Sequence, residues 1–195
     1  HIRIIFNGNG YSEEWVKEAE RRGLPNIKNM VDALGYLTEE SAIELFEKHK
    51  VMTKVELTSR QEVGYESYAK AINIEARTMI DMAKKEIIPA VIKYTTTVAQ
   101  SIAAVKAVGA DASVQEASLA EISKNLVAMN AALEKLETAT DKAAAVEEPK
   151  AQAIAYRDDV FTAMSELREP ADALEMLVDK SVWPFPTYGD LLFNV

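Results

Sequence analysis

The sequence predicts a mainly α-helical protein: an antiparallel bundle of three long helices, preceded by a short strand and smaller helices. Two observations support this fold class. Residues 111–180 contain no glycine, and residues 54–108 contain one glycine and one proline. Within both stretches apolar residues recur at steps of three and four, the spacing of one face of an α-helix. We divide the chain into a front piece (1–50), a long-helix bundle (51–182) and an aromatic, proline-containing tail (183–195).

The front piece opens with a short apolar run, residues 2–6, that is rich in β-branched side chains and is followed by the turn sequence Asn7–Gly10. This pattern predicts a strand that ends in a turn. A lone strand cannot satisfy its own backbone hydrogen-bonding groups, and no partner strand is readable downstream. We therefore expect this strand to pair with sequence outside the chain or with another molecule.

Short helices complete the front piece, over residues 12–22, 29–34 and 38–49. The first has a good N-cap in Ser12. It should end just before Gly23, which suits the left-handed position after a helix.

The first long helix begins at the Thr53–Glu56 pair, which has the spacing of a capping box, and ends at Gly109. Pro89 predicts a kink in it, because proline removes a backbone donor. The buried face is predicted from residues at helical spacing, namely Ile72, Ala76, Met79, Ala83, Ile87, Val91, Thr95, Val98, Ile102 and Val105.

The second long helix starts near Val114, and the third near Pro149, a residue suited to a first helical turn. The second carries a coiled-coil-type seam, made of Ile122, Leu126, Met129, Leu133 and Leu136. The third helix has the same spacing of apolar residues, namely Val160, Met164, Leu167, Ala171 and Leu174. Pro170 predicts a kink or restart in the third helix. Short connections between long amphipathic helices predict antiparallel packing.

Composition excludes several functional classes. The chain has 31 acidic and 22 basic residues and a formal net charge of −9, which argues against binding nucleic acid or anionic membranes. It has no cysteine, so disulfides and thiolate metal sites are excluded. No apolar run approaches the roughly 20 residues of a membrane span, and no signal-peptide pattern is present. We expect a cytoplasmic protein, and the absence of an initiator methionine suggests the interior of a longer one.

The sequence offers no catalytic, cofactor-binding or metal-binding residue. The loop Asn7–Gly10 lacks the Lys-Ser/Thr of a phosphate-binding loop, so an ordinary turn is favoured. The two histidines, His1 and His49, lack partners at ligand spacing, and no Ser-His-Asp set can be assembled. Paired carboxylates such as Asp158 and Asp159 are neighbours that do not face each other on a helix, and we interpret them as a solvated face.

The tail is the candidate binding element, because it concentrates aromatic residues, namely Trp183, Phe185, Tyr188 and Phe193. Pro184 and Pro186 cannot continue a helix, so the third helix should end near Val182, followed by an extended segment with a turn at Tyr188–Asp190. Burying one aromatic side chain stabilises by roughly 1.5–3 kcal/mol, whereas ordering each residue costs about 1–2 kcal/mol. Docking of the tail is therefore favourable in free energy only if the tail binds a surface that is already formed. We predict that the tail folds back over the bundle or the front piece and holds it. The alternative is a flexible end that becomes ordered only on a neighbouring molecule.

Three segments together resemble one family: "FNGNGYSEEWVKEAERRGLPN", "ELTSRQEVGYESYAKAINIEARTMIDMAKKEIIPAVIKY" and "ELREPADALEMLVDKSVWPFPTYGDLLF". They are similar to the carboxyl-terminal part of type III glutamine synthetase, a large bacterial form of that enzyme. The similarity runs in order from about Phe6 to Phe193 and is weak over residues 108–146.

The resemblance implies a parent enzyme that ligates ammonia to glutamate with ATP and Mg or Mn, in a ring-shaped homo-oligomer. Its catalytic residues would lie in an α+β domain that precedes this chain, and residues 1–50 would be the end of that domain. No catalytic or metal-binding motif of the family matches a position here. The chain would then be structural, supporting the oligomer and contacting the rest of its own catalytic domain. The alternative is a free-standing helical interaction or assembly module, which would have the same composition.

Overall fold

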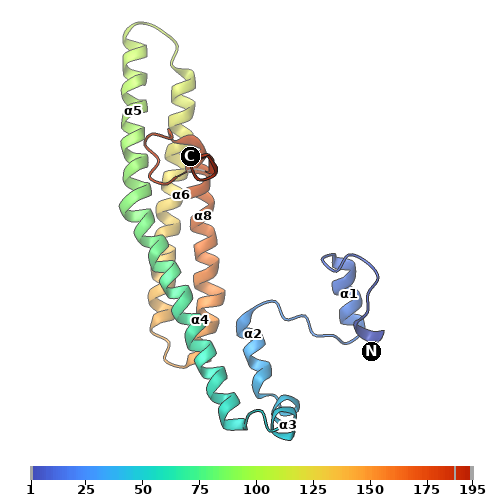
Figure 1. Cartoon of the computed structure of the whole chain (residues 1–195). Helices are drawn as coiled ribbons and strands as arrows, with labels where there is room; N and C mark the ends of the chain where they lie inside the picture. The colour runs from blue at the N-terminus through green and yellow to red at the C-terminus, as the bar shows by residue number, and fades with distance from the viewer. Residues whose placement is uncertain (1, 187, 194–195) are drawn as a thin grey trace. The chain divides into compact units, whose positions relative to one another are not determined.

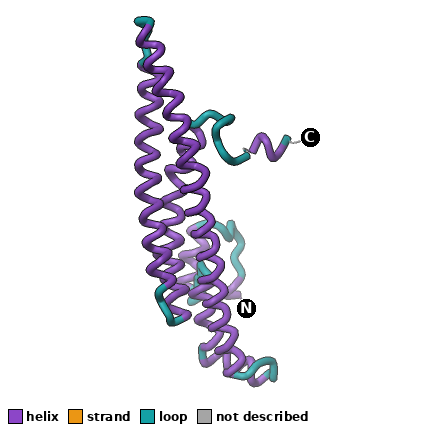
Figure 2. The backbone as a smooth tube through the Cα atoms, turned by 90° about the vertical axis from the view of Figure 1, so that its left-hand side faces the viewer, coloured by secondary structure: helices purple, strands orange, loops and turns teal. Residues whose placement is uncertain are grey.

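The computed structural model describes residues 2–186 and 188–193. Over these residues the chain forms helices and no strand (Figures 1 and 2). The predicted mainly α-helical class is therefore confirmed. The chain divides into two compact units, residues 1–68 and residues 69–195.

The first unit consists of short helical elements and the beginning of a long helix. In chain order these are η1 (Ile2–Ile4), α1 (Glu13–Arg21), α2 (Met30–Gly35), η2 (Tyr36–Thr38), α3 (Glu40–Lys48) and the start of α4 (Lys54–Met82). The Ser12 hydroxyl caps α1 by accepting the Trp15 backbone N–H at 3.4 Å, and Gly23 takes φ +69° after the helix ends. The three short helices expected in the front piece are thus present.

The predicted strand at residues 2–6 is wrong. Ile2–Ile4 form a 3-10 turn, and the Ile5 N–H donates to the first carbonyl of that turn at 3.1 Å. A strand needs a second strand to satisfy its backbone groups, and none occurs among the described residues. The Arg22 guanidinium satisfies these carbonyls instead: its Nη1 lies 2.6 Å from the Ile5 oxygen and 3.2 Å from the Arg3 oxygen.

A small cluster holds this first segment against α1. The Phe6 ring stacks on Trp15 with 4.6 Å between centroids, and the Arg22 guanidinium lies 5.5 Å from the centre of the Trp15 ring. Glu18 accepts hydrogen bonds from Arg21 and Arg22, which lower the pKa of its carboxyl to about 2. These contacts explain why the apolar start of the chain lies against α1.

The capping box predicted at the start of α4 is confirmed. The Thr53 N–H donates to the Glu56 carboxylate at 2.7 Å, and the Glu56 N–H donates to the Thr53 hydroxyl at 3.3 Å. The bonds from Thr53 lower the pKa of the Glu56 carboxyl. Two otherwise unpaired donors at the helix start are satisfied in this way.

Within the first unit, α2 packs closely on α4. The Gln61 amide donates to the Leu34 carbonyl at 2.8 Å and to the Thr38 hydroxyl at 2.9 Å. A Cβ atom placed on Gly64 would lie 2.5 Å from Leu34 Cδ2. Glycine at this position therefore allows the Leu34 side chain to lie directly on the α4 backbone.

The second unit contains the three long helices. Its elements are the rest of α4, the π-helical turn η3 (Ala83–Ile87), α5 (Ile88–Ala107), α6 (Ser113–Ala144), α7 (Pro149–Ala155), the π-helical turn η4 (Tyr156–Val160), α8 (Phe161–Leu177) and α9 (Tyr188–Leu192). The segments α4–η3–α5 and α7–η4–α8 each run as one continuous helix. Together with α6 they form the predicted antiparallel bundle (Figure 1).

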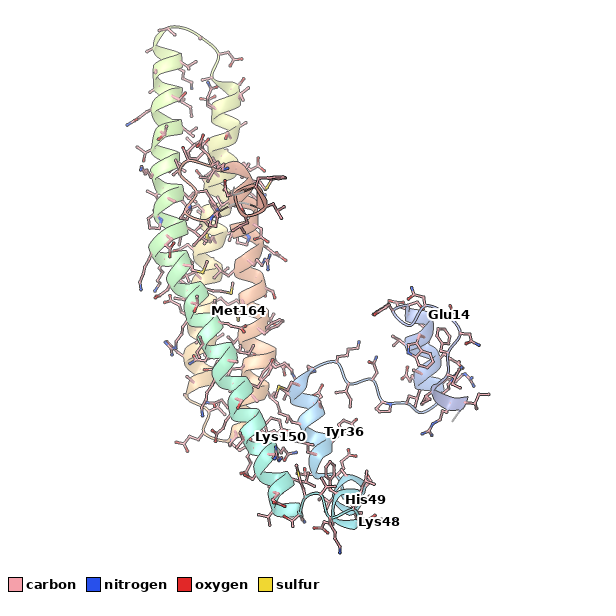
Figure 3. All side chains as sticks on the ribbon, viewed as in Figure 1. Glu14, Tyr36, Lys48, His49, Lys150 and Met164 are labelled. Atoms are coloured by element: carbon pink, nitrogen blue, oxygen red, sulfur yellow. The ribbon has the colours of Figure 1, made fainter. Side chains whose placement is uncertain are left out.

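The bundle core is centred on α6, which packs against α5 on one side and α8 on the other. The predicted seam of α6 faces inward: Ile122, Met129 and Leu136 have no exposed surface, and Leu133 is 2% exposed. From the third helix, Val160, Leu167 and Leu174 are buried, and Met164, labelled in Figure 3, is 8% exposed. Most of the residues that the apolar periodicity selected are therefore buried. The exceptions are half-buried, namely Met79, Thr95, Ile102, Val105, Leu126 and Ala171.

Ion pairs between the helices follow the antiparallel arrangement. Near the carboxyl-terminal end of α6, Arg77 lies 4.0 Å from Asp141, and Lys84 pairs with Glu137. Near the turn that connects α5 to α6, Lys106 pairs with Glu116. All of these groups are at least partly exposed, so each pair contributes little stability. They support the relative position of helices that the core already packs together.

The kink predicted at Pro89 takes the form of a widened turn. Proline lacks an N–H, and its ring collides with the carbonyl four residues earlier in a regular α-helix. Here the π-helical turn η3 directly precedes α5, and Pro89 occupies the first turn of α5. The extra residue in η3 accommodates the proline without ending the helix. At Pro170, in contrast, α8 continues from Phe161 to Leu177, so the predicted restart does not occur.

We expect Gly64→Ala to destabilise the protein although alanine is the better helix former. The added methyl group overlaps Leu34, which is only 9% exposed, and overpacking of this kind costs about 1–3 kcal/mol. That cost exceeds the gain of up to about 1 kcal/mol from helix propensity. Chemical denaturation of both proteins measures the difference.

Gly35→Ala is the matched control, because a Cβ there would approach only the Tyr65 hydroxyl, at 4.0 Å, and Gly35 has helical dihedral angles. It should be neutral or stabilising. Equal stability of Gly64→Ala and the parent protein would contradict the close packing of Leu34 on α4.

Candidate functional site

The acidic and histidine side chains that the structure describes do not form a metal-ligand cluster. In the part of the chain that the structure describes, no three or more His, Cys, Asp or Glu side chains gather where they could hold a metal ion. His49 is an exposed residue at the end of α3 (Figure 3), and His1 lies outside the described residues. The described residues therefore do not fit the ligand set of a catalytic divalent metal.

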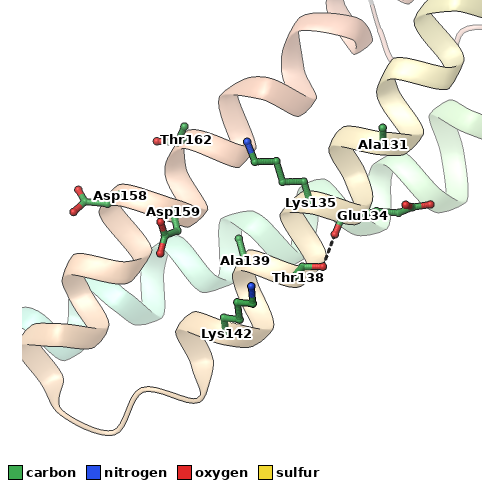
Figure 4. Close-up of a pocket in the computed structure, with 9 residues that line it drawn as sticks. All are labelled: Ala131, Glu134, Lys135, Thr138, Ala139, Lys142, Asp158, Asp159 and Thr162. Carbon is green, nitrogen blue, oxygen red and sulfur yellow. Dashed lines mark hydrogen bonds between the residues drawn. The ribbon is translucent and has the colours of Figure 1, made fainter.

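An open groove of about 550 Å³ lies between α6 and the η4–α8 segment (Figure 4). Lys135 and Lys142 line it from α6, and Asp158 and Asp159 line it from η4. The two carboxylates diverge in Figure 4, as expected for adjacent residues on a helix. Ala139, which lies on α6 like the two lysines, has a small side chain and leaves the hollow unfilled.

The charges in this groove are partly neutralised and exposed. Lys135 Nζ lies 2.5 Å from a Glu166 oxygen, and Arg157 Nε lies 2.6 Å from Asp158 Oδ1, which lowers the pKa of the Asp158 carboxyl. A ligand would have to compete with water for groups that stay hydrated in the free protein. The groove is therefore a solvated surface, as interpreted from the sequence for Asp158 and Asp159.

The third helix ends earlier than the sequence predicts. α8 stops at Leu177 and Val178 is extended, whereas the two prolines placed the end near Val182. Asp179 ends the helix, because its carboxylate accepts the Ser181 N–H at 2.7 Å and its carbonyl accepts the Trp183 N–H at 3.0 Å. Bonding to Ser181 also lowers the pKa of the Asp179 carboxyl.

The tail is compact near the bundle and helical at its end. The Trp183 and Phe185 rings meet edge to face with 6.5 Å between centroids. The turn predicted at Tyr188–Asp190 is wrong, because Tyr188–Leu192 form the short helix α9. Lys180 Nζ lies 2.5 Å from Asp190 Oδ1, a contact that links α9 to the chain preceding the prolines.

The end of the tail exposes three consecutive apolar residues. Leu191, Leu192 and Phe193 are 65%, 72% and 79% exposed, whereas Trp183 and Phe185 are half-buried. The segment leaves the helices of the bundle in Figure 2. The aromatic residues were predicted from the sequence, whereas the two leucines were not, although they directly precede Phe193. The Tyr188 side chain lies outside the described part, and docking of the tail stays a prediction.

These features define a class of protein: a helical domain with its own core and an exposed apolar carboxyl-terminal segment, in which the described residues form no metal-ligand cluster. A family model described as "Glutamine synthetase C-terminal domain" matches residues 1–106. The chain therefore belongs to the glutamine synthetase C-terminal domain family, and the resemblance inferred from its motifs is confirmed.

Named relatives extend this similarity to the whole chain. It is 37% identical to a "Glutamine synthetase" from Butyrivibrio fibrisolvens over 197 aligned residues, which cover 100% of this chain and 28% of that protein. It is 32% identical to a "Glutamine synthetase" from Bacteroides fragilis and 30% identical to a "Type-3 glutamine synthetase" from Dictyostelium discoideum, each over 27% of that protein. The chain thus spans little more than a quarter of the length of these relatives.

None of the helices formed by residues 2–186 and 188–193 is both long enough and apolar enough to cross a bilayer.

Proposed function

We propose that this chain is the carboxyl-terminal helical region of a type III glutamine synthetase, and that it supports the architecture of the enzyme without performing its chemistry. The observation that carries this proposal is the alignment of the entire chain with 28% of a named glutamine synthetase. The parent enzyme would ligate ammonia to glutamate with ATP in the cytoplasm, as part of nitrogen assimilation.

The chemistry of phosphoryl transfer is the reason to assign a structural role to this chain and the catalytic role to the rest of the parent enzyme. That reaction needs metal ions and cationic groups clustered around the phosphates. The carboxylates of the described residues are dispersed along helices, and no metal-binding group of three was found there. ATP and Mg or Mn would therefore bind in the part of the parent enzyme that lies outside this chain.

We infer that the partners of the chain are the rest of its own catalytic domain and neighbouring subunits of a ring-shaped homo-oligomer, rather than nucleic acid or membrane. The net charge of −9 opposes association with polyanions. The tail is the candidate contact, because Leu191, Leu192 and Phe193 remain in water in this chain alone. Pro184 and Pro186 restrict the tail before binding, which reduces the entropy lost on docking.

The chain alone should not form glutamine. Incubated with ATP, Mg²⁺, glutamate and ammonia, it should release no phosphate above a protein-free blank, whereas the full-length enzyme serves as the positive control. The reason is that the described residues contain no metal-ligand cluster, which phosphoryl transfer needs. Phosphate release at a rate comparable to that of the full-length enzyme would contradict a purely structural role.

Tail docking predicts that Phe193→Ala has different effects in the two contexts. In this chain alone the Phe193 side chain is 79% exposed, so the substitution should change stability by less than about 0.5 kcal/mol. In the full-length oligomer, where the ring would be buried, it should cost roughly 1.5–3 kcal/mol. Denaturation midpoints of both proteins, with and without the substitution, measure this.

Met176→Ala provides the control for this experiment, because Met176 is 85% exposed on α8 and belongs to no proposed contact. This substitution should leave the denaturation midpoints of both proteins unchanged. If Phe193→Ala is also silent in the full-length oligomer, the tail does not dock through Phe193.

A further inference from the structure

The loop before α1 contains two consecutive Asn–Gly pairs, Asn7–Gly8 and Asn9–Gly10, and all four residues are exposed. We propose that Asn7–Gly8 is a site of spontaneous deamidation and that the fold protects Asn9–Gly10. This inference does not depend on the proposed function.

The chemistry needs only the chain and water. The Gly8 backbone nitrogen loses its proton and attacks Asn7 Cγ, which forms a new N–C bond. The Cγ–Nδ2 bond then breaks, and the leaving nitrogen takes up protons to depart as ammonia. Water opens the resulting succinimide at either carbonyl, giving aspartate or isoaspartate. Glycine favours the attack because it has no Cβ to crowd the nitrogen, and asparagine is known as a thermolabile residue.

Hydrogen bonds distinguish the two asparagines. Asn9 Oδ1 accepts the Tyr11 N–H at 3.0 Å, and the Asn9 carbonyl accepts the Ser12 N–H at 3.1 Å and the Ser12 hydroxyl at 2.8 Å. These bonds hold the Asn9 amide towards Tyr11, a local arrangement typical of asparagine in turns. To react, this amide must rotate towards Gly10 and lose its bond.

Asn7 has no comparable restraint. Its side chain makes no hydrogen bond to any residue that the structure describes. The Gly8 N–H likewise donates to none of them, so the attacking nitrogen is not engaged. Asn7 can therefore reach the reactive geometry without breaking a hydrogen bond.

Deamidation at Asn7 would act on the cluster beside α1. Asn7 directly follows Phe6, whose ring stacks on Trp15. A Cβ on Gly8 would lie 2.7 Å from the Phe6 ring, so the chain passes close to that ring. Isoaspartate lengthens the backbone by one methylene group at this point and adds a carboxylate. We expect it to displace Phe6 from Trp15 and to loosen the start of the chain.

The test is to age the intact chain in mildly alkaline buffer and to map products in the tryptic peptide Ile4–Lys17 by fragmentation mass spectrometry. In the folded protein, Asn7 should convert several-fold faster than Asn9. In the same peptide free in solution, where the Asn9 bonds are absent, the two rates should become similar. Asn7→Gln should remove the main product, and the matched Asn9→Gln should leave it. Equal rates or a faster Asn9 in the folded chain, or an unchanged preference in the free peptide, would overturn the proposal.

Discussion

The structure of the bundle depends on one constraint: the apolar seam of α6 must be covered by two helices at once. A single amphipathic helix can cover one face, but the α6 seam of Ile122, Met129 and Leu136 is fully buried only because α5 and α8 pack on it together. The other features of the second unit accommodate that arrangement. The widened turn before Pro89 keeps the first long helix continuous beside α6, and the exposed ion pairs follow the antiparallel arrangement without providing much stability.

A domain with such a core can be rigid without forming an active site. Its charged groups stay on the surface, and the groove between α6 and α8 keeps its lysines and carboxylates in water. Leu191, Leu192 and Phe193, at the end of the tail, are among the apolar side chains that remain exposed. This distribution suits a part of a larger enzyme that is recognised through its end, and it is the physical basis for proposing a structural role.

The sequence predicted what depends on periodicity and capping. The long helices, the α6 seam, the Thr53–Glu56 box and the left-handed Gly23 follow from local rules, and Asp158 and Asp159 are exposed as predicted. The prediction from sequence failed where the conformation depends on distant groups. Residues 2–6 have the composition of a strand, but the Arg22 guanidinium satisfies their carbonyls. The π-helical turn η4 has no sequence signal, and the early end of α8 depends on Asp179 and Ser181 rather than on the prolines. The aromatic tail was recognised from composition, but its partner cannot be read from this chain.

Residue-resolved amide hydrogen exchange tests the central role of α6 most directly. The slowest-exchanging amides of a protein open only on global unfolding, whereas frayed ends and loops exchange through local opening. We predict that the slowest amides lie in α6 around residues 122–136, and that those of η1 and α9 exchange fastest. Exchange of α6 as fast as that of α1, with the greatest protection elsewhere, would contradict a bundle organised on α6.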